Sequence, residues 1–186
     1  MAHVVLFHSI LGLRPVEHEI AAHFQRHGHT VSLPDLFGGR TTNDYDAGFA
    51  QRKEVGNQAI MAAARAAVDS APASAVLAGV SFGAALVSEF WLSRPDMAGA
   101  LLMAGVTDWM DPRRPGFPIS AHIARPDPFD DDAFFDDWVA GAGGVALNLH
   151  RYDGVGHYFL DRSLPDFGAL QAQLCLDRAV AFLNTL

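Results

Sequence analysis

The sequence predicts an α/β fold in which a doubly wound, mostly parallel sheet of about six strands is flanked by helices. Short apolar runs of strand length alternate along the chain with longer segments whose apolar residues recur at helical spacing. This alternation is typical of parallel strands joined by right-handed helical crossovers. Polar residues with catalytic potential follow the apolar runs rather than precede them, as expected for a site at the carboxyl edge of such a sheet.

The composition favours a single globular domain over residues 1–186. Half of the residues are hydrophobic and 18% are charged, which is enough apolar material for a full core. The formal net charge of -8 argues against a nucleic-acid partner, because contacts to the phosphate backbone require a basic surface. No apolar run reaches the roughly 18 residues that a membrane span needs. The single cysteine, Cys175, and the lack of a basic leader predict a cytoplasmic protein without a membrane anchor.

The first half of the chain is expected to form three strands and the helices that connect them. One helix begins at Pro15, because the fixed φ of proline suits a first helical turn, and it ends at Gly28. A long helix is expected from about 46 to 70, since Ile60, Ala64 and Val68 recur at helical spacing. The strands are the apolar runs at 3–7, 30–33 and 75–78.

The second half continues the alternation. A helix whose apolar positions include Leu86 and Phe90 is expected to end before Pro95. A loop rich in proline, aspartate and arginine covers 106–118. The remaining expected strands lie at 99–104, 119–123 and 144–149, and the remaining helices lie at 130–139 and 168–183.

Residues 79–83 form the motif G-x-S-x-G between an apolar strand and a helix. A strand that turns directly into a helix places its tip residue, here Ser81, in a strained conformation with an exposed hydroxyl. A side chain at Gly79 or Gly83 would block the close approach of helix and strand. The first amides of the helix lack backbone partners, so the amide of Phe82 can face a developing oxyanion. A glycine-flanked serine in an ordinary loop is the alternative, and the flanking elements favour the nucleophile.

Three polar residues occur in the order serine, aspartate, histidine, which is the chain order of α/β-hydrolases. Ser81, Asp127 and His157 each follow a predicted strand. A serine hydroxyl needs a base within hydrogen-bond reach, and histidine needs a carboxylate to fix its tautomer. The alternatives are a surface histidine at 157, a turn-forming aspartate at 127, and Asp108 as the acid in its place.

Other residues near the same sheet edge are candidates for lining the pocket, against the alternative of ordinary packing. They are His8, Phe37, Trp109 and Tyr158. No metal site is expected. His18 and His23 are five residues apart rather than four, and His23 with His27 lacks a third ligand. The aspartates at 130–132 lack the glycine and the spacing of a calcium loop.

The chain resembles the dienelactone hydrolase family. Four segments carry the likeness: 9–12, 34–37 with the sequence Pro-Asp-Leu-Phe, the motif at 79–83, and 156–159 before the last helix. The segment that begins at Asp127 corresponds to the family's acid. The resemblance implies a compact α/β-hydrolase fold without a cap domain. It also implies a triad of Ser81, Asp127 and His157, with an oxyanion hole formed by the amides of Phe82 and Ile10.

The chain also departs from the family pattern. The namesake enzymes use cysteine where this chain has Ser81, and their first loop carries a glutamate where this chain has Ser9. Arg40 and Arg162 each lie near a substrate-binding arginine of the family, and Arg40 is about one residue beyond its counterpart. Ser9 and Arg40 therefore join the candidates for substrate binding.

These departures predict a serine esterase-like enzyme that cleaves a small ester, lactone or thioester through an acyl-enzyme, without a cofactor. The alternatives are a non-catalytic protein of this fold that binds a ligand, and an acyltransferase with the same triad. A monomer and a homodimer are both compatible with the sequence.

Overall fold

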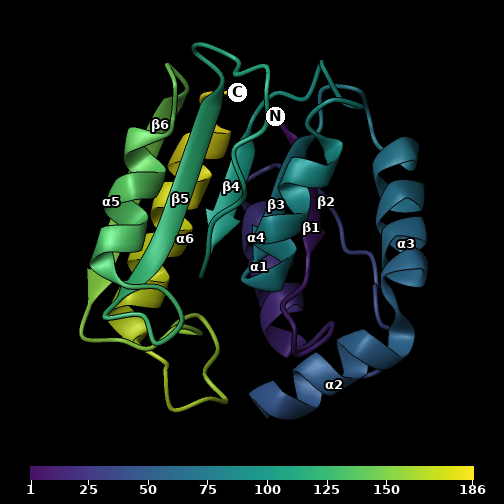
Figure 1. The fold of residues 1–186 in the computed structure, drawn as a ribbon, viewed down its shortest axis with the longest axis vertical. Helices are drawn as coiled ribbons and strands as arrows, with labels where there is room; N and C mark the ends of the chain where they lie inside the picture. Colours follow the sequence, from purple (N-terminus) through teal and green to yellow (C-terminus); the bar gives the residue numbers. More distant parts are fainter.

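The computed structural model describes residues 1–186 and contains one six-stranded sheet in the order β2-β1-β3-β4-β5-β6 (Figure 1). Every neighbouring pair of strands is parallel. The chain winds outward from β1 in one direction to β2 and then in the other direction from β3 to β6, so the predicted doubly wound sheet is confirmed. The strands are β1 (His3–Phe7), β2 (Thr30–Ser32), β3 (Val76–Val80), β4 (Ala100–Met103), β5 (Pro118–Arg125) and β6 (Ala146–Asp153).

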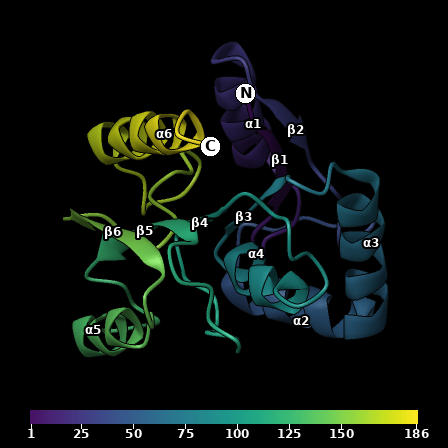
Figure 2. The same cartoon turned by 90° about the horizontal axis from the view of Figure 1, so that it is seen from above.

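Helices cover both faces of the sheet (Figure 2). One face carries α1 and α6, which contact each other, and the other carries α3, α4 and α5. Between these layers, β3 and β4 are buried at every position, as expected for strands covered on both sides. The helices are α1 (Pro15–Arg26), α2 (Tyr45–Val55), α3 (Asn57–Ser70), α4 (Phe82–Ala85), the 3-10 helix η1 (Leu86–Phe90), α5 (Asp132–Ala140) and α6 (Ala169–Leu183).

The single helix expected from 46 to 70 is wrong, because the structure divides it into α2 and α3 at Gly56. Gly56 has a φ of +80°, a left-handed conformation that interrupts the helix and that glycine adopts without a steric cost. The helix begins one residue earlier than expected, since Asp44 caps its N-terminus by accepting a hydrogen bond from the amide of Ala47 at 2.8 Å. The break lets α2 turn across the end of the sheet where the site lies.

The other boundaries differ by smaller amounts. The helix after Ser81 is one short α-helical turn followed by the 3-10 turn η1, both before Pro95. Strand β6 extends past the expected end at 149, because Tyr152 and Asp153 still pair with Ala124 and Arg125 of β5. The chain has no cap domain over the sheet. None of its helices combines the length and the apolar character needed to cross a bilayer.

Candidate active site

Ser81 stands at the turn between β3 and α4. Its φ of 53° and ψ of -114° place a non-glycine residue in the positive-φ region, which costs on the order of 1–3 kcal/mol and is typical of functional sites. The turn is held from both sides. The amide of Ser81 donates to the carbonyl of Met103 at 2.8 Å, and its carbonyl accepts from the amide of Ala84 at 2.8 Å. These bonds fix the backbone and leave the hydroxyl projecting from the edge of the sheet.

The two glycines of the motif are required by close packing. A Cβ atom at Gly79 would lie 2.1 Å from the carbonyl carbon of Gly83. A Cβ atom at Gly83 would lie 2.3 Å from the carbonyl oxygen of Phe7 in β1. Both distances are far below van der Waals contact, so the helix passes as close to the strands as the sequence predicts.

The structure brings Ser81, Asp127 and His157 together in a chain of hydrogen bonds. The Oγ atom of Ser81 lies 2.8 Å from Nε2 of His157, and Nδ1 of His157 lies 2.7 Å from Oδ2 of Asp127. The side chains of His157 and Asp127 are only 7% and 1% exposed. When Nδ1 donates to the carboxylate, Nε2 is free to accept the hydroxyl proton of Ser81.

Asp127, rather than Asp108, is the partner of His157. The loop after β5 holds Asp127, and its Oδ1 accepts a hydrogen bond from the amide of Phe129 at 2.9 Å. Asp108 is exposed and lies in the wall of the cavity beside Ser81. Asp130 lies close to Asp127. Burial, followed by the charge of Asp127, raises the pKa of the Asp130 carboxyl above its ordinary value.

Phe82 follows Ser81 directly in the chain, and Ile10 lines the same cavity. Phe82 is the first residue of α4, so the helix offers its amide no carbonyl partner. Ile10 belongs to the loop after β1 and lines the cavity together with Ser81 and Phe82. Both residues lie at the cavity wall, and the oxyanion hole stays a prediction.

A buried carboxylate that the sequence analysis missed supports this loop. Glu17 is fully buried and accepts hydrogen bonds from the amides of Ser9 at 3.2 Å and Arg14 at 2.9 Å. Burial raises the pKa of Glu17 above its ordinary value. The sequence could have indicated this role, because Glu17 lies in the first turn of α1, where acidic side chains accept hydrogen bonds from free amides. Glu17 thereby fixes the backbone that carries Ile10.

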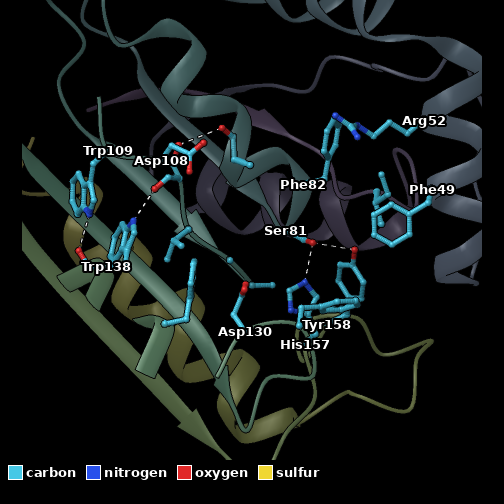
Figure 3. A pocket seen from close by; sticks show the side chains of 18 of the residues that line it. Phe49, Arg52, Ser81, Phe82, Asp108, Trp109, Asp130, Trp138, His157 and Tyr158 are labelled. Atoms are coloured by element: carbon cyan, nitrogen blue, oxygen red, sulfur yellow. Dashed lines mark hydrogen bonds between the residues drawn. The ribbon is translucent and has the colours of Figure 1, made fainter. Parts of the chain in front are cut away.

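Tyr158 donates a hydrogen bond to Oγ of Ser81 at 3.1 Å (Figure 3). It is 3% exposed, and burial raises the pKa of its phenol to about 12. The ring stacks on Tyr45 at a centroid distance of 5.3 Å. Asp166 accepts from both the Tyr45 hydroxyl and the Tyr158 amide at 2.9 Å, so the phenol is held in place from two directions.

A cavity of about 450 Å³ opens beside Ser81. Its walls are mostly apolar and aromatic. Trp109 and Trp138 stack at a centroid distance of 4.6 Å, and Figure 3 shows this pair on one side of Ser81, with Phe49 and Phe82 on the other. The charged groups of the lining, apart from His157, are Arg52, Asp108, Asp130 and Asp137.

Of the residues expected to line the pocket, Trp109 and Tyr158 do so, and four others do not. His8 is fully buried beneath the site, where Nδ1 donates to the carbonyl of Ser9 at 2.7 Å and Nε2 accepts from the amide of Leu36 at 2.9 Å. Burial lowers the pKa of His8, which suits this neutral form. Ser9 is buried in the same loop, and Phe37 packs on the rings of His8 and Phe82.

The two arginines near the expected substrate-binding positions also lie outside the cavity. Arg40 is half exposed and pairs with Glu54 at 2.7 Å. Arg162 pairs with Glu19 at 3.2 Å and is 71% exposed. The cation that does line the cavity is Arg52, whose guanidinium lies 5.1 Å from the centroid of the Phe82 ring.

Several lining residues were missed because they belong to α2 and α5, two helices that the sequence analysis did not connect with the site. Phe49 and Arg52 come from α2, while Phe134, Asp137 and Trp138 come from α5. The signal available in the sequence of α2 was a pair of aromatic residues, Tyr45 and Phe49, spaced four residues apart on one helix face. No cluster of three or more histidine, cysteine, aspartate or glutamate side chains is arranged to hold a metal ion.

Comparisons with known proteins place the chain among α/β-hydrolases. The model of the dienelactone hydrolase family matches residues 1–186, and a search of curated proteins found no match.

Three solved structures illustrate the shared fold. A protein from Klebsiella pneumoniae subsp. pneumoniae MGH 78578, assigned as a dienelactone hydrolase, has a TM-score of 0.80 and 13% identity over 100% of this chain and 88% of its own. A dienelactone hydrolase-like promiscuous phosphotriesterase from metagenomic libraries has a TM-score of 0.78 and 16% identity over 100% and 87%. The esterase PE8 has a TM-score of 0.63 and 17% identity over 99% and 92%.

Proposed function

Since the chain belongs to the dienelactone hydrolase family, we propose that it is a serine hydrolase that cleaves a small ester, lactone or thioester through an acyl-enzyme. The observation that carries this proposal is the hydrogen-bonded chain from Ser81 through His157 to Asp127. A hydroxyl becomes an effective nucleophile at neutral pH when a base lies within hydrogen-bond reach, and the distance of 2.8 Å meets that requirement.

The reaction begins when Oγ of Ser81 attacks the substrate carbonyl carbon and its proton moves to Nε2 of His157. The carboxylate of Asp127 stabilises the resulting imidazolium and stays ionised. As the tetrahedral intermediate collapses, the imidazolium gives its proton to the leaving alcohol or thiol, and the acyl group remains on Oγ. A water molecule then attacks the acyl carbon, with His157 again as the base. The acid product leaves, and the hydroxyl of Ser81 is restored.

Charge that develops on the carbonyl oxygen is stabilised by the amides of Phe82 and Ile10. In this scheme the phenol of Tyr158 is a third donor. Its raised pKa keeps it protonated at neutral pH, and its hydroxyl donates a hydrogen bond to Oγ of Ser81. Once Oγ has bonded to carbon, the phenol can donate to the adjacent oxyanion. One such donor typically contributes a factor of a hundred or more to the rate.

A fluorophosphonate probe tests the function directly. We expect the intact protein to gain the mass of one phosphonyl group on Ser81, and we expect p-nitrophenyl acetate to be hydrolysed. The variant Ser81→Ala should lose both properties while it keeps its thermal unfolding temperature. A folded wild-type protein that neither reacts with the probe nor hydrolyses the ester would contradict the proposal and favour a ligand-binding protein. Transfer of the acyl group to an added alcohol in preference to water would identify an acyltransferase.

A further inference from the structure

We propose that the cavity beside Ser81 selects substrates whose recognised group is apolar and neutral, and that it discriminates against substrates bearing a carboxylate. The inference rests on the proposed function, since it names the substrate class of the same site.

The half of the cavity formed by α5 and the loop after β4 offers few hydrogen-bond donors to a ligand. The indole of Trp109 donates to the carbonyl of Trp138 at 2.6 Å, and the indole of Trp138 donates to the carbonyl of Thr107 at 2.7 Å. Both donors are therefore occupied within the protein. The stacked rings, together with Val106 and Phe134, leave mainly carbon surface for contact. Such a wall binds apolar groups by excluding water from both surfaces.

The charges along the cavity are unfavourable for an anion. Asp108, Asp130 and Asp137 all contribute to the lining. None of them pairs with a cation, since the salt bridges of the chain involve other acidic residues. A substrate carboxylate would meet the negative charges of Asp108 and Asp137, which are exposed, and the half-buried carboxyl of Asp130. It would be repelled even though solvent screens part of the interaction.

Two arginines lie near enough to be considered as anion partners. Arg52 lines the opposite half of the cavity, where its exposed guanidinium rests over the ring of Phe82, and Figure 3 shows it on the far side of Ser81 from the tryptophan pair. Arg113 lies 5.5 Å from the ring centroid of Trp109, outside the lining, and is paired with Asp111 at 2.9 Å. One exposed cation therefore faces three carboxylates.

Two matched series of esters test this selectivity. In the first series the alcohol is methanol and the acyl group is hexanoyl, 6-aminohexanoyl or the free-acid form of adipoyl. In the second series the acyl group is acetyl and the alcohol is hexanol, 6-aminohexanol or 6-hydroxyhexanoate. We expect the carboxylate member to have the lowest kcat/KM in both series, by at least tenfold relative to the neutral member. A carboxylate member within threefold of the neutral one in either series overturns the proposal.

Charge-neutralising variants identify the groups responsible. Asp108→Asn combined with Asp137→Asn should reduce the penalty on the carboxylate member by at least threefold. Asp69→Asn, which removes the same charge at an exposed position of α3 outside the cavity, serves as the control and should leave the ratio unchanged. An equal effect of the control, or no effect of the double variant, means that the cavity carboxylates do not set the selectivity.

A binding measurement separates this inference from the proposed function. In Ser81→Ala, the fluorescence of the cavity tryptophans reports binding of 4-phenylbutanamide and of 4-phenylbutanoate, which differ mainly in charge. We expect the amide to bind at least tenfold more tightly. Preference for the amide without ester hydrolysis by the wild type would contradict the proposed function alone. Ester hydrolysis without preferential binding of the amide would contradict the substrate class alone. If neither were observed, both the substrate class and the proposed function would be contradicted.

Discussion

At the scale of single residues, the site depends on side chains whose neighbours leave them one productive arrangement. Asp127 is almost completely buried and shares its oxygens between Nδ1 of His157 and the amide of Phe129. The ring of His157 packs edge-on against Phe129 and Tyr158, with centroid distances of 4.7 and 4.8 Å. Packing and hydrogen bonding together hold Nε2 toward Ser81, which is the condition for fast proton transfer.

Replacing Tyr158 by phenylalanine should lower kcat by about a hundredfold or more, because one of three proposed donors to the oxyanion is lost. The apolar wall remains, so KM should change by less than about threefold. Steady-state kinetics with p-nitrophenyl acetate check both values. Tyr45→Phe is the matched control, since it keeps the stacked ring and removes only the hydroxyl that donates to Asp166. An unchanged kcat in Tyr158→Phe would restrict the phenol to a packing role.

The sequence shows which residues follow a strand, but it does not show where their side chains point. Ser81, Asp127 and His157 could be found because each follows a strand, and parallel strands end at one edge. His8 follows a strand equally well, yet its ring is buried under the loop and bonded to Ser9 and Leu36. Position after a strand places a residue at the edge without specifying whether its side chain points into the cavity or into the core.

At the scale of elements, the division between α2 and α3 shapes the site. Helix α2 has little apolar content, with Gly48 as its one buried residue, yet it supplies Phe49 and Arg52 to the cavity. A Cβ at Gly48 would lie 2.8 Å from the carbonyl oxygen of Ile10. Glycine at this position therefore allows α2 to approach the loop that contains Ile10. A continuous helix could not both pack on the sheet as α3 does and reach this loop.

Replacing Gly56 by alanine should destabilise the protein by about 1–2 kcal/mol, because φ is +80° and an alanine Cβ is strained there. No atom lies within 4 Å of the added Cβ, so the loss comes from backbone conformation alone. Urea denaturation measures the change in the free energy of unfolding. Gly56→Asn should lose a similar amount, since a ψ of 145° lies outside the left-handed helical region that asparagine tolerates. No measurable loss of stability in Gly56→Ala would contradict the conformational explanation.

The strands could be predicted more reliably than the helix boundaries, for a physical reason. A strand buried on both faces is apolar at every position, and that pattern is independent of what packs against it. The helical spacing of Ile60, Ala64 and Val68 correctly indicates α3, but it does not fix the residue at which the helix begins. Gly56 was visible in the sequence, although glycine inside a helix is tolerated at a cost of about 1 kcal/mol, so its presence alone did not require a break.

At the scale of the whole molecule, the sheet carries a polar network as well as an apolar core. His122 in β5 is fully buried. Its ring hydrogen bonds to the hydroxyls of Ser120 at 2.9 Å and Tyr152 at 2.8 Å, and it stacks on His150 of β6. His122 falls within the strand expected at 119–123, and the structure places its side chain in the core. This network joins β5 and β6, which hold Asp127 and His157 at their ends.

Folding stability should therefore fall as the pH drops below neutrality. Burial, reinforced by His150 and Arg178, lowers the pKa of His122 from 6.5 to about 3. Between these values the unfolded chain binds a proton that the folded chain excludes, so this contribution to stability is complete above pH 6.5 and is lost as the pH falls toward 3. The slope from this one group is at most about 1.4 kcal/mol per pH unit. Burial also lowers the pKa of His8 and His150, and these groups act in the same direction.

Urea denaturation between pH 4 and pH 7 measures this slope. His122→Gln keeps a polar side chain in the network and removes the titration, so stability should depend less steeply on pH, by up to one proton, although the variant is less stable at pH 7. His18→Gln alters an exposed histidine of α1 and should leave the slope of the wild type unchanged. If His122→Gln retained the full slope, the proton would be taken up elsewhere. If it removed most of the slope, the contact between β5 and β6 around His122 would be the acid-sensitive part of the fold. Activity at low pH would then be lost together with the sheet that positions Asp127 and His157.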